Sequence, residues 1–243
     1  MTRSPIEIDR ILCPTDFSVF SSRALRHAIA MAQRFEARLT VLHVIPPVLS
    51  YGGVPPYSPA LAVVSPPLRE QIEGELRAFV EPALAARVPT QIDIREGDPW
   101  REIERVAGEL PADLVVMGTH GRKGLSHLVL GSVTEKVMHR VPCPVLAVGA
   151  GQTEPPEAPP YRRILCPTKL MPASQLAVDF ALALAAQSDA AVELLHVIES
   201  MPSGADGADP FEGAPEFAAL RERMVAEADA ELRRSIPPGL GNW

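Results

Sequence analysis

The hexapeptide RILCPT stands at residues 10–15 and again at residues 163–168. The tetrapeptide LHVI follows at residues 42–45 and returns at 195–198, so one offset of 153 residues relates both pairs. Two matches at one spacing indicate an internal duplication. Between the copies, GAGQTEPPEAPP contains four prolines and two glycines, which suit an extended linker. The sequence therefore predicts a first domain over residues 1–148, a linker over 149–160 and a partial second repeat over 161–243.

The overall composition is that of a folded, water-soluble chain. Hydrophobic residues make up 47% of the 243 residues and charged residues 22%, which excludes disorder and a coiled coil. No apolar run reaches the ~18 residues of a membrane span, and residues 1–10 contain no signal-peptide core. The net charge is −7 and the basic residues are scattered, which disfavours nucleic acid as a partner. We therefore expect a cytoplasmic protein that binds neither membranes nor nucleic acid.

Strand-like and helix-like segments alternate strictly through the first domain. Short apolar runs predict five strands, at residues 8–14, 39–45, 91–95, 114–117 and 145–148. Apolar residues at helical spacing predict four helices, at residues 21–35, 68–88, 100–110 and 132–140. This alternation predicts an α/β fold, an open parallel sheet with helices on both faces.

The second repeat follows only the first part of this plan. It predicts strands at 163–167 and 192–198 and helices at 173–187 and 216–234, and three strands of the first domain have no counterpart. Two strands make a sheet too small to be stable alone. We expect this truncated copy to pack against the first domain or against another chain.

A glycine-containing stretch begins where the predicted fourth strand ends. It reads GTHGRKGLSHLVLGS over residues 118–132 and finishes where a helix begins. In open parallel sheets, ligands bind beyond the carboxyl ends of the strands. Gly118 and Gly121 would let backbone N–H groups approach a phosphate, and Gly131 with Ser132 opens a helix whose free N–H groups favour an anion.

Other residues of this stretch have two interpretations each. Arg122 and Lys123 could add positive charge beside phosphates or could be solvated loop residues. Ser132 and Glu135 match the S-x-x-E capping box, so Ser132 could be a plain helix cap. His120 could contact a ligand.

The spacing Gly-x2-Gly-x9-Gly-Ser is neither a Walker A loop nor the GxGxxG fingerprint. It resembles the ATP-binding members of the universal stress protein family. The same resemblance extends to Pro14-Thr15-Asp16, His43-Val44 and the turn at residues 96–99, and covers the whole first domain. It implies a Rossmann-like five-stranded sheet of order 3-2-1-4-5, with ATP, alone or with Mg²⁺, between the ends of strands one and four.

The resemblance also implies which residues would hold the nucleotide. Asp16 and its neighbours would lie beside adenine and ribose, Val44 against the adenine ring, and the glycine stretch around the phosphates. Asp16 could instead cap the following helix, and Val44 could be ordinary core. The full set of candidate site residues is Pro14, Thr15, Asp16, Val44, Met117, Gly118, His120, Gly121, Arg122, Gly131, Ser132 and Val133.

The second repeat departs from the pattern at its decisive positions. Lys169 stands where the offset of 153 places the counterpart of Asp16, and no glycine stretch follows. We therefore expect no nucleotide there, and Val197, the match of Val44, to be core.

The remaining histidines and cysteines predict no catalytic or metal centre. We expect His43 and His196 to be structural and His27, His127 and His139 to lie on helix surfaces, without a metal cluster or a Ser-His-Asp triad. Cys13, Cys143 and Cys166 lack CxxC spacing and predict small buried side chains.

Three functions fit these observations. The first is an ATP-binding stress or signalling protein with at most slow ATP hydrolysis, because no general base is evident. The second is an interaction module with a vestigial, empty pocket. In the family the edge strand, here Val145–Val148, pairs with another unit, which implies a homodimer. The third is an ATP-dependent enzyme such as a nucleotidyl transferase or an ATP pyrophosphatase.

Overall fold

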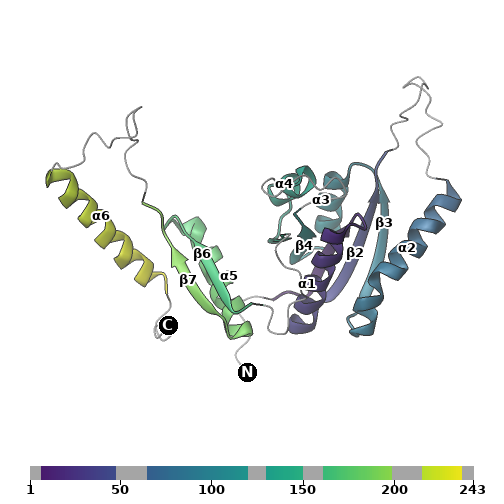
Figure 1. Cartoon of the computed structure of the whole chain (residues 1–243), viewed down its shortest axis with the longest axis horizontal. Helices are drawn as coiled ribbons and strands as arrows, with labels where there is room; N and C mark the ends of the chain where they lie inside the picture. Colours follow the sequence, from purple (N-terminus) through teal and green to yellow (C-terminus); the bar gives the residue numbers. More distant parts are fainter. Residues whose placement is uncertain (1–6, 48–64, 120–129, 150–160, 199–214, 237–243) are drawn as a thin grey trace, which may run out of the picture. The chain divides into compact units, whose positions relative to one another are not determined.

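The computed structural model describes residues 7–47, 65–119, 130–149, 161–198 and 215–236. The chain divides into two compact units, and the boundary between them falls between residues 160 and 161. The elements of the first unit are β1 (Arg10–Thr15), α1 (Val19–Phe35), β2 (Arg38–Ile45), α2 (Pro66–Ala85), β3 (Thr90–Glu96), α3 (Pro99–Glu109), β4 (Leu114–Gly118), α4 (Ser132–Met138) and β5 (Val145–Val148) (Figure 1).

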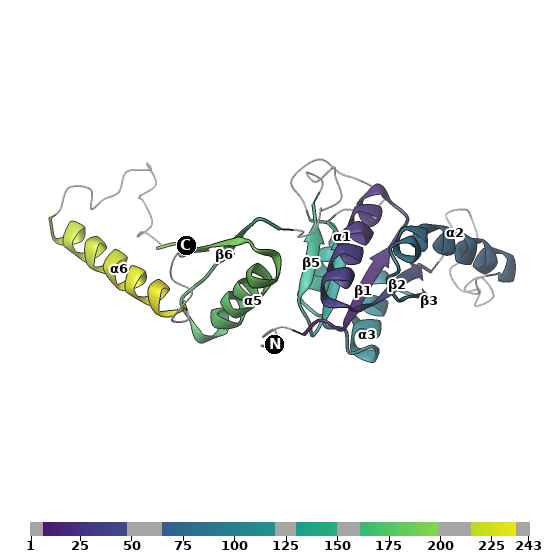
Figure 2. The same ribbon diagram turned by 90° about the horizontal axis from the view of Figure 1, so that it is seen from below.

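The first unit is a single parallel sheet of order β3-β2-β1-β4-β5, so the predicted order 3-2-1-4-5 is confirmed. Helices α1 and α2 lie on one face, and α3 and α4 lie on the other (Figures 1 and 2). All five residues of β1 after the first are buried, because β1 is the central strand and both its faces are covered. This explains why the strand reads as a continuous apolar run rather than an alternating one.

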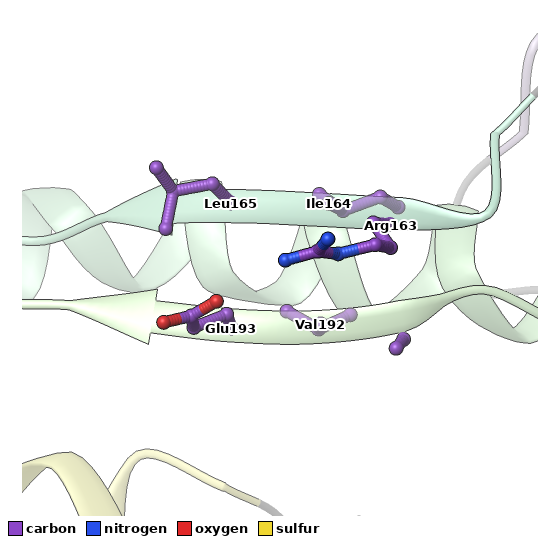
Figure 3. A pocket seen from close by; sticks show the side chains of 6 residues that line it. Arg163, Ile164, Leu165, Val192 and Glu193 are labelled. Atoms are coloured by element: carbon purple, nitrogen blue, oxygen red, sulfur yellow. The ribbon is translucent and has the colours of Figure 1, made fainter.

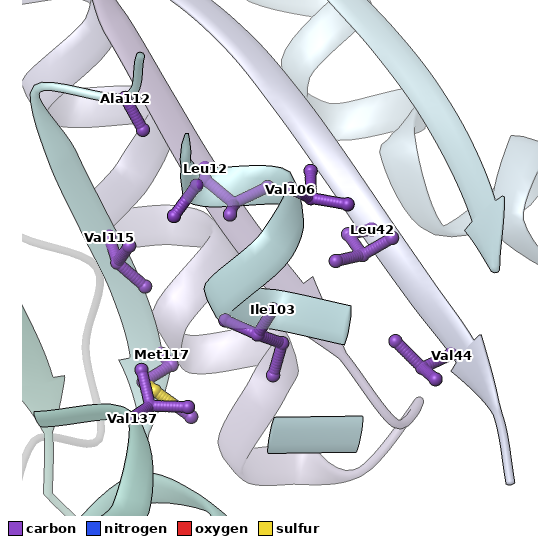
Figure 4. Close-up of a cluster of buried hydrophobic side chains, with 10 residues drawn as sticks. Leu12, Leu42, Val44, Ile103, Val106, Ala112, Val115, Met117 and Val137 are labelled. Atoms are coloured by element: carbon purple, nitrogen blue, oxygen red, sulfur yellow. The ribbon is translucent and has the colours of Figure 1, made fainter. Parts of the chain in front are cut away.

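The hydrophobic core on the face covered by α3 and α4, here called the α3-face core, contains side chains from the sheet and from both helices (Figure 4). Leu12 and Leu42 come from the two central strands and have no exposed surface. Burying such a side chain contributes about 1.5–3 kcal/mol. The cluster consists of Leu12, Leu42, Val44, Ile103, Val106, Ala107, Ala112, Val115, Met117 and Val137.

The second unit repeats the first two strands of the sheet in the same register. Its elements are β6 (Arg163–Pro167), α5 (Pro172–Ser188), β7 (Ala191–Leu195) and α6 (Pro215–Arg234). Arg163 pairs with Ala191 as Arg10 pairs with Arg38, again at the offset of 153. The second strand ends at Leu195, three residues before its predicted end. Helix α5 covers one face, where Cys166, Val178 and Ala181 form a small core.

The other face of this two-stranded sheet is open. Leu165 is 59% exposed and Leu195 41% exposed, whereas their counterparts Leu12 and Leu42 in the first unit are fully buried. Leu165 and Glu193 point away from α5 and line a shallow hollow of about 380 Å³ (Figure 3). The described part of this unit has no counterpart of β4 or α3, and those are the elements that cover the same positions in the first unit. What covers this face stays a prediction.

The cysteines have the predicted environment. Cys13 and Cys166 are buried, Cys143 is partly buried, and all three are free thiols. Burial raises the pKa of Cys13 from 9.0 to about 12. Among the helices of the described segments, none has the length and apolar character to cross a membrane.

Candidate functional site

The turn after β1 fixes Asp16 at the carboxyl end of the central strand. Asp16 is half-buried, and its Oδ1 accepts a hydrogen bond from the Ser18 N–H at 3.1 Å. Helix α1 is capped by Ser18, whose Oγ accepts from the Ser21 N–H at 3.2 Å. The alternative interpretation of Asp16 as the cap of this helix is therefore wrong. Its carboxylate is held by a local Asx turn instead.

An aromatic cluster that sequence reasoning missed supports this turn. Phe17 has a left-handed backbone with φ of 63°, which costs about 1–2 kcal/mol for a residue other than glycine. Its ring stacks on His43 with centroids 4.5 Å apart, and Phe79 of α2 meets it edge-on at 5.8 Å. Aromatic pairs contribute about 0.5–1.5 kcal/mol each and so offset the backbone cost.

His43 joins the ends of β1 and β2. Its Nδ1 lies 2.8 Å from the Thr15 carbonyl oxygen. Because a carbonyl can only accept, Nδ1 carries the proton. The structural role expected for His43 agrees with this bond. The second unit repeats it, since Nδ1 of His196 lies 2.9 Å from the Thr168 carbonyl oxygen.

The start of α4 lies directly against the end of β4. The Gly131 N–H donates to the Thr119 carbonyl at 2.7 Å, and Thr134 Oγ1 donates to the Gly118 carbonyl at 2.9 Å. Gly131 is the N-cap residue and Ser132 is the first residue of the helix. The capping-box interpretation of Ser132 is therefore wrong, because its side chain lies one position too late to cap.

This arrangement decides which amides can meet a ligand. The Gly131 N–H already has an acceptor, so it is not available to a phosphate. The amides of Ser132 and Val133 belong to the first helical turn and have no acceptor within the helix. Ser132 is also exposed to solvent.

Gly118 is required by packing as well as by its place in the motif. A Cβ at this position would lie 2.9 Å from both the carbonyl carbon and the Cβ of Phe20. Carbon atoms in contact prefer separations of ~3.5–4.0 Å. The first turn of α1 can approach β4 this closely only because residue 118 has no side chain.

Register brings the two halves of the site together. Strands β1 and β4 are parallel neighbours with Leu12 opposite Val115. Continuing that register places Thr15 beside Gly118. Asp16 and the start of α4 therefore both lie at the carboxyl end of the sheet.

The remaining candidates divide into core residues and residues outside the description. Val44 and Met117 are buried in the α3-face core and Val133 packs partly against it, so core packing of Val44 is confirmed. Pro14 and Thr15 are buried in β1. Residues 120–129 of the glycine stretch lie outside the described residues, and they include His120, Gly121, Arg122 and Lys123.

The second unit keeps the turn but not its charge. Leu170 has φ of 55° and its N–H donates to Thr168 Oγ1 at 3.1 Å, matching Phe17 and Thr15. Lys169 occupies the Asp16 position and is exposed. The expectation that Val197 is core is wrong, because this residue is 68% exposed whereas its counterpart Val44 is buried.

One histidine prediction is wrong and one lies beyond the description. His27 is 4% exposed, because it falls on the buried face of α1 rather than on its surface. His139 is exposed at the end of α4, and His127 lies outside the described residues. The described segments contain no group of three His, Cys, Asp or Glu side chains that could hold a metal ion.

Sequence comparison finds the same family in both units. The family model described as the universal stress protein family matches residues 7–149 and 160–238. A universal stress protein of Methanocaldococcus jannaschii is 36% identical over 139 residues, which cover 57% of this chain and 81% of that protein. One from Thermus aquaticus is also 36% identical over 139 residues, which cover 96% of its length.

Solved structures agree with this result. Universal stress protein UspA from Lactobacillus plantarum is 28% identical with a TM-score of 0.51, covering 58% of this chain and 98% of its own. A universal stress protein from Archaeoglobus fulgidus has a TM-score of 0.62 over 90% of this chain and 73% of its own; at 21% identity it shows a shared fold. The resemblance found in the sequence is confirmed, and the chain belongs to the universal stress protein family.

Proposed function

We propose that the first unit binds an adenine nucleotide, ATP, at the carboxyl edge of its sheet. One observation carries the proposal. A half-buried carboxylate, Asp16, and the first-turn amides of α4 meet at the edge where β1 and β4 end side by side. Acceptor and donor groups of these kinds suit a ribose or adenine on one side and a phosphate chain on the other.

Each group would have a separate task. Asp16 would accept hydrogen bonds from ribose hydroxyls or the adenine amino group. The amides of Ser132 and Val133 would donate to phosphate oxygens, as would amides of the glycine stretch around Gly121. Mg²⁺, if it accompanies ATP, would be held mainly by the phosphates and water, since Mg²⁺ needs few protein ligands.

The proposed role is that of a nucleotide-responsive stress or signalling protein in the cytoplasm. The described residues supply donors for phosphate but no side chain placed to activate a water molecule. ATP hydrolysis would therefore be slow at most. The nucleotide would act by stabilising the conformation or assembly that binds it.

The test is a calorimetric titration with Mg-ATP of the parent chain and the variant Ser132→Glu. A carboxylate at the first helical position stabilises a helix but repels phosphate, so folding should persist while affinity falls at least about tenfold. Ser65→Glu is the matched control, because Ser65 is exposed at the start of α2 and its side chain makes no capping bond. Equal affinity in the parent and Ser132→Glu, or no binding by the folded parent, would contradict the proposal.

A second candidate function, assembly through β5, rests on its place at the edge of the sheet. The Pro144 carbonyl accepts from Val115 of β4, and the Val148 carbonyl accepts from Thr119, just after β4. The alternating backbone groups of Val145 and Ala147 therefore face outward. Another β5 could pair with this edge and give a homodimer. Ala147→Pro removes one outward N–H and no bond to β4, and edge strands tolerate proline.

Light scattering at micromolar concentration tests this candidate. The parent and the control Ala147→Val should have the mass of a dimer, and Ala147→Pro the mass of a monomer. A monomeric parent would overturn it.

A further inference from the structure

Trp100 lies at the start of α3 and is not one of the candidate nucleotide-site residues. Its ring packs partly against the α3-face core. Its indole N–H is buried and has no hydrogen-bond partner among the described residues. A buried N–H without a hydrogen-bond partner destabilises the fold, so hydrogen bonding does not explain the presence of this side chain.

Three cations converge on the Trp100 ring. The Arg140 guanidinium lies 4.7 Å from the ring centroid, the Arg101 guanidinium 5.1 Å and the Lys136 ammonium 5.4 Å. They come from α3, from α4 and from the residues just after α4. All three charges therefore lie within about 10.5 Å of one another, the sum of the two longest distances to the centroid. At this separation, salt at physiological concentration screens them only partly.

Few carboxylates neutralise this group. Lys136 and Arg140 have no ion pair in the described part of the chain, and Arg101 reaches Asp98 only at 3.9 Å with both side chains exposed. Of the other carboxylates on these two helices, Glu102 and Glu109 pair with Arg105, and Glu104 and Glu135 form no ion pair within the described segments. On a chain of net charge −7, the group is a local positive patch built on an apolar ring.

We propose that this patch, formed by Trp100, Arg101, Lys136 and Arg140, binds an acidic segment of a partner protein. Three like charges brought together are stabilised when carboxylates bind between them, and guanidinium groups bind carboxylates with paired hydrogen bonds. The three cations come from three separate side chains, each able to bind its own carboxylate, and an acidic segment carries several carboxylates on one backbone. Nucleic-acid binding rests on neutralising many phosphates along a backbone, whereas this patch supplies three cations.

The test uses Trp100 itself as the reporter. The chain has two tryptophans, and replacing the other by Trp243→Phe leaves Trp100 as the single source of indole emission. Titration of the full chain with an acetylated oligoglutamate peptide should change this emission to saturation. The affinity should fall as salt rises, since these charges are at the surface.

Two double variants with the same change of net charge decide whether the patch is responsible. Lys136→Gln with Arg140→Gln should weaken the binding of the peptide several-fold, up to about thirtyfold, the effect of losing two surface charge contacts of ordinary strength. Arg34→Gln with Arg38→Gln removes two exposed cations elsewhere and should leave the affinity within about twofold.

Three results would overturn the proposal. One is an unchanged Trp100 emission at millimolar peptide. Another is equal weakening by both double variants, which would mean non-specific attraction. The third is tighter binding of inorganic phosphate or of a single-stranded DNA oligonucleotide than of the peptide, which would assign the patch to a different ligand. Circular dichroism of each variant confirms that it is folded.

Discussion

Replacing Gly118 by alanine tests the packing that brings α1 against β4. The new methyl group would lie 2.9 Å from two atoms of Phe20, one of them in the backbone, so α1 must withdraw by about 0.6 Å or more. Overpacking of this kind costs ~1–3 kcal/mol. Alanine recovers about 0.4–1 kcal/mol by restricting the unfolded chain. We expect a net loss of about 1–2 kcal/mol in the free energy of unfolding.

Urea unfolding followed by Trp100 fluorescence, in the Trp243→Phe background, measures this loss within the first unit. The urea concentration at the midpoint of unfolding should fall, while the dependence of the free energy of unfolding on urea concentration stays constant. Gly74→Ala is the matched control. Gly74 lies inside α2 and a Cβ there meets nothing within 4 Å, so the same substitution should add about 0.5–1 kcal/mol. A Gly118→Ala chain as stable as the parent would refute the reasoning.

Two further predictions concern single side chains of the first unit. Glu36 ends α1 with φ of 55°, so Glu36→Gly should raise the free energy of unfolding by about 0.5–1 kcal/mol in the same urea assay. The Cys13 thiol has a folded-state pKa of about 12 against an ordinary value of 9.0. Its burial therefore contributes fully to the free energy of unfolding below pH 9. This contribution is lost between pH 9 and 12, where only the unfolded thiol ionises. In that window, stability should fall with rising pH about 1.4 kcal/mol per unit more steeply in the parent than in Cys13→Ala, and equal slopes would contradict the burial argument.

The order of the elements could be predicted from the sequence because each element leaves a local signal. The apolar run before Pro14 and the periodic spacing after Ser21 are enough to identify a strand and a helix, and the offset of 153 identifies the duplication. Every predicted strand and helix is present. Every boundary lies within three residues of its prediction, and α2 and β7 each end three residues early. The residues that follow Leu195 continue the apolar pattern, but the pairing with β6 ends at Pro167 opposite Leu195, and the described part of the second unit has no other strand beside them.

The site was less predictable, because its details depend on contacts between distant residues. Nothing local indicates that Gly118 faces Phe20 or that Phe17 stacks on His43. The position of the N-cap at Gly131 follows from its bond to Thr119, which sequence spacing cannot show. The motif therefore indicated the segment between the end of β4 and the start of α4. Which of its backbone N–H groups remain free for a ligand depends on tertiary packing.

The open face of the second unit also depends on contacts between residues that are distant in the sequence. The sequence of β6 closely matches that of β1, so it carries an apolar residue, Leu165, where β1 has a buried one, Leu12. The strand pattern alone predicts a covered face. The elements that cover it in the first unit come later in the fold, and the described part of the second unit lacks them.

The most direct test of the account counts the nucleotides bound by each chain. Mass spectrometry under native conditions, on the purified chain with ATP at a concentration near its dissociation constant, should find at most one adenine nucleotide per chain, and the Ser132→Glu chain should show much lower occupancy at the same concentration. One site is expected because the first unit has Asp16 opposite the start of α4, whereas the second has Lys169 at the same position. A folded chain that takes up no nucleotide, or two per chain, would contradict the account.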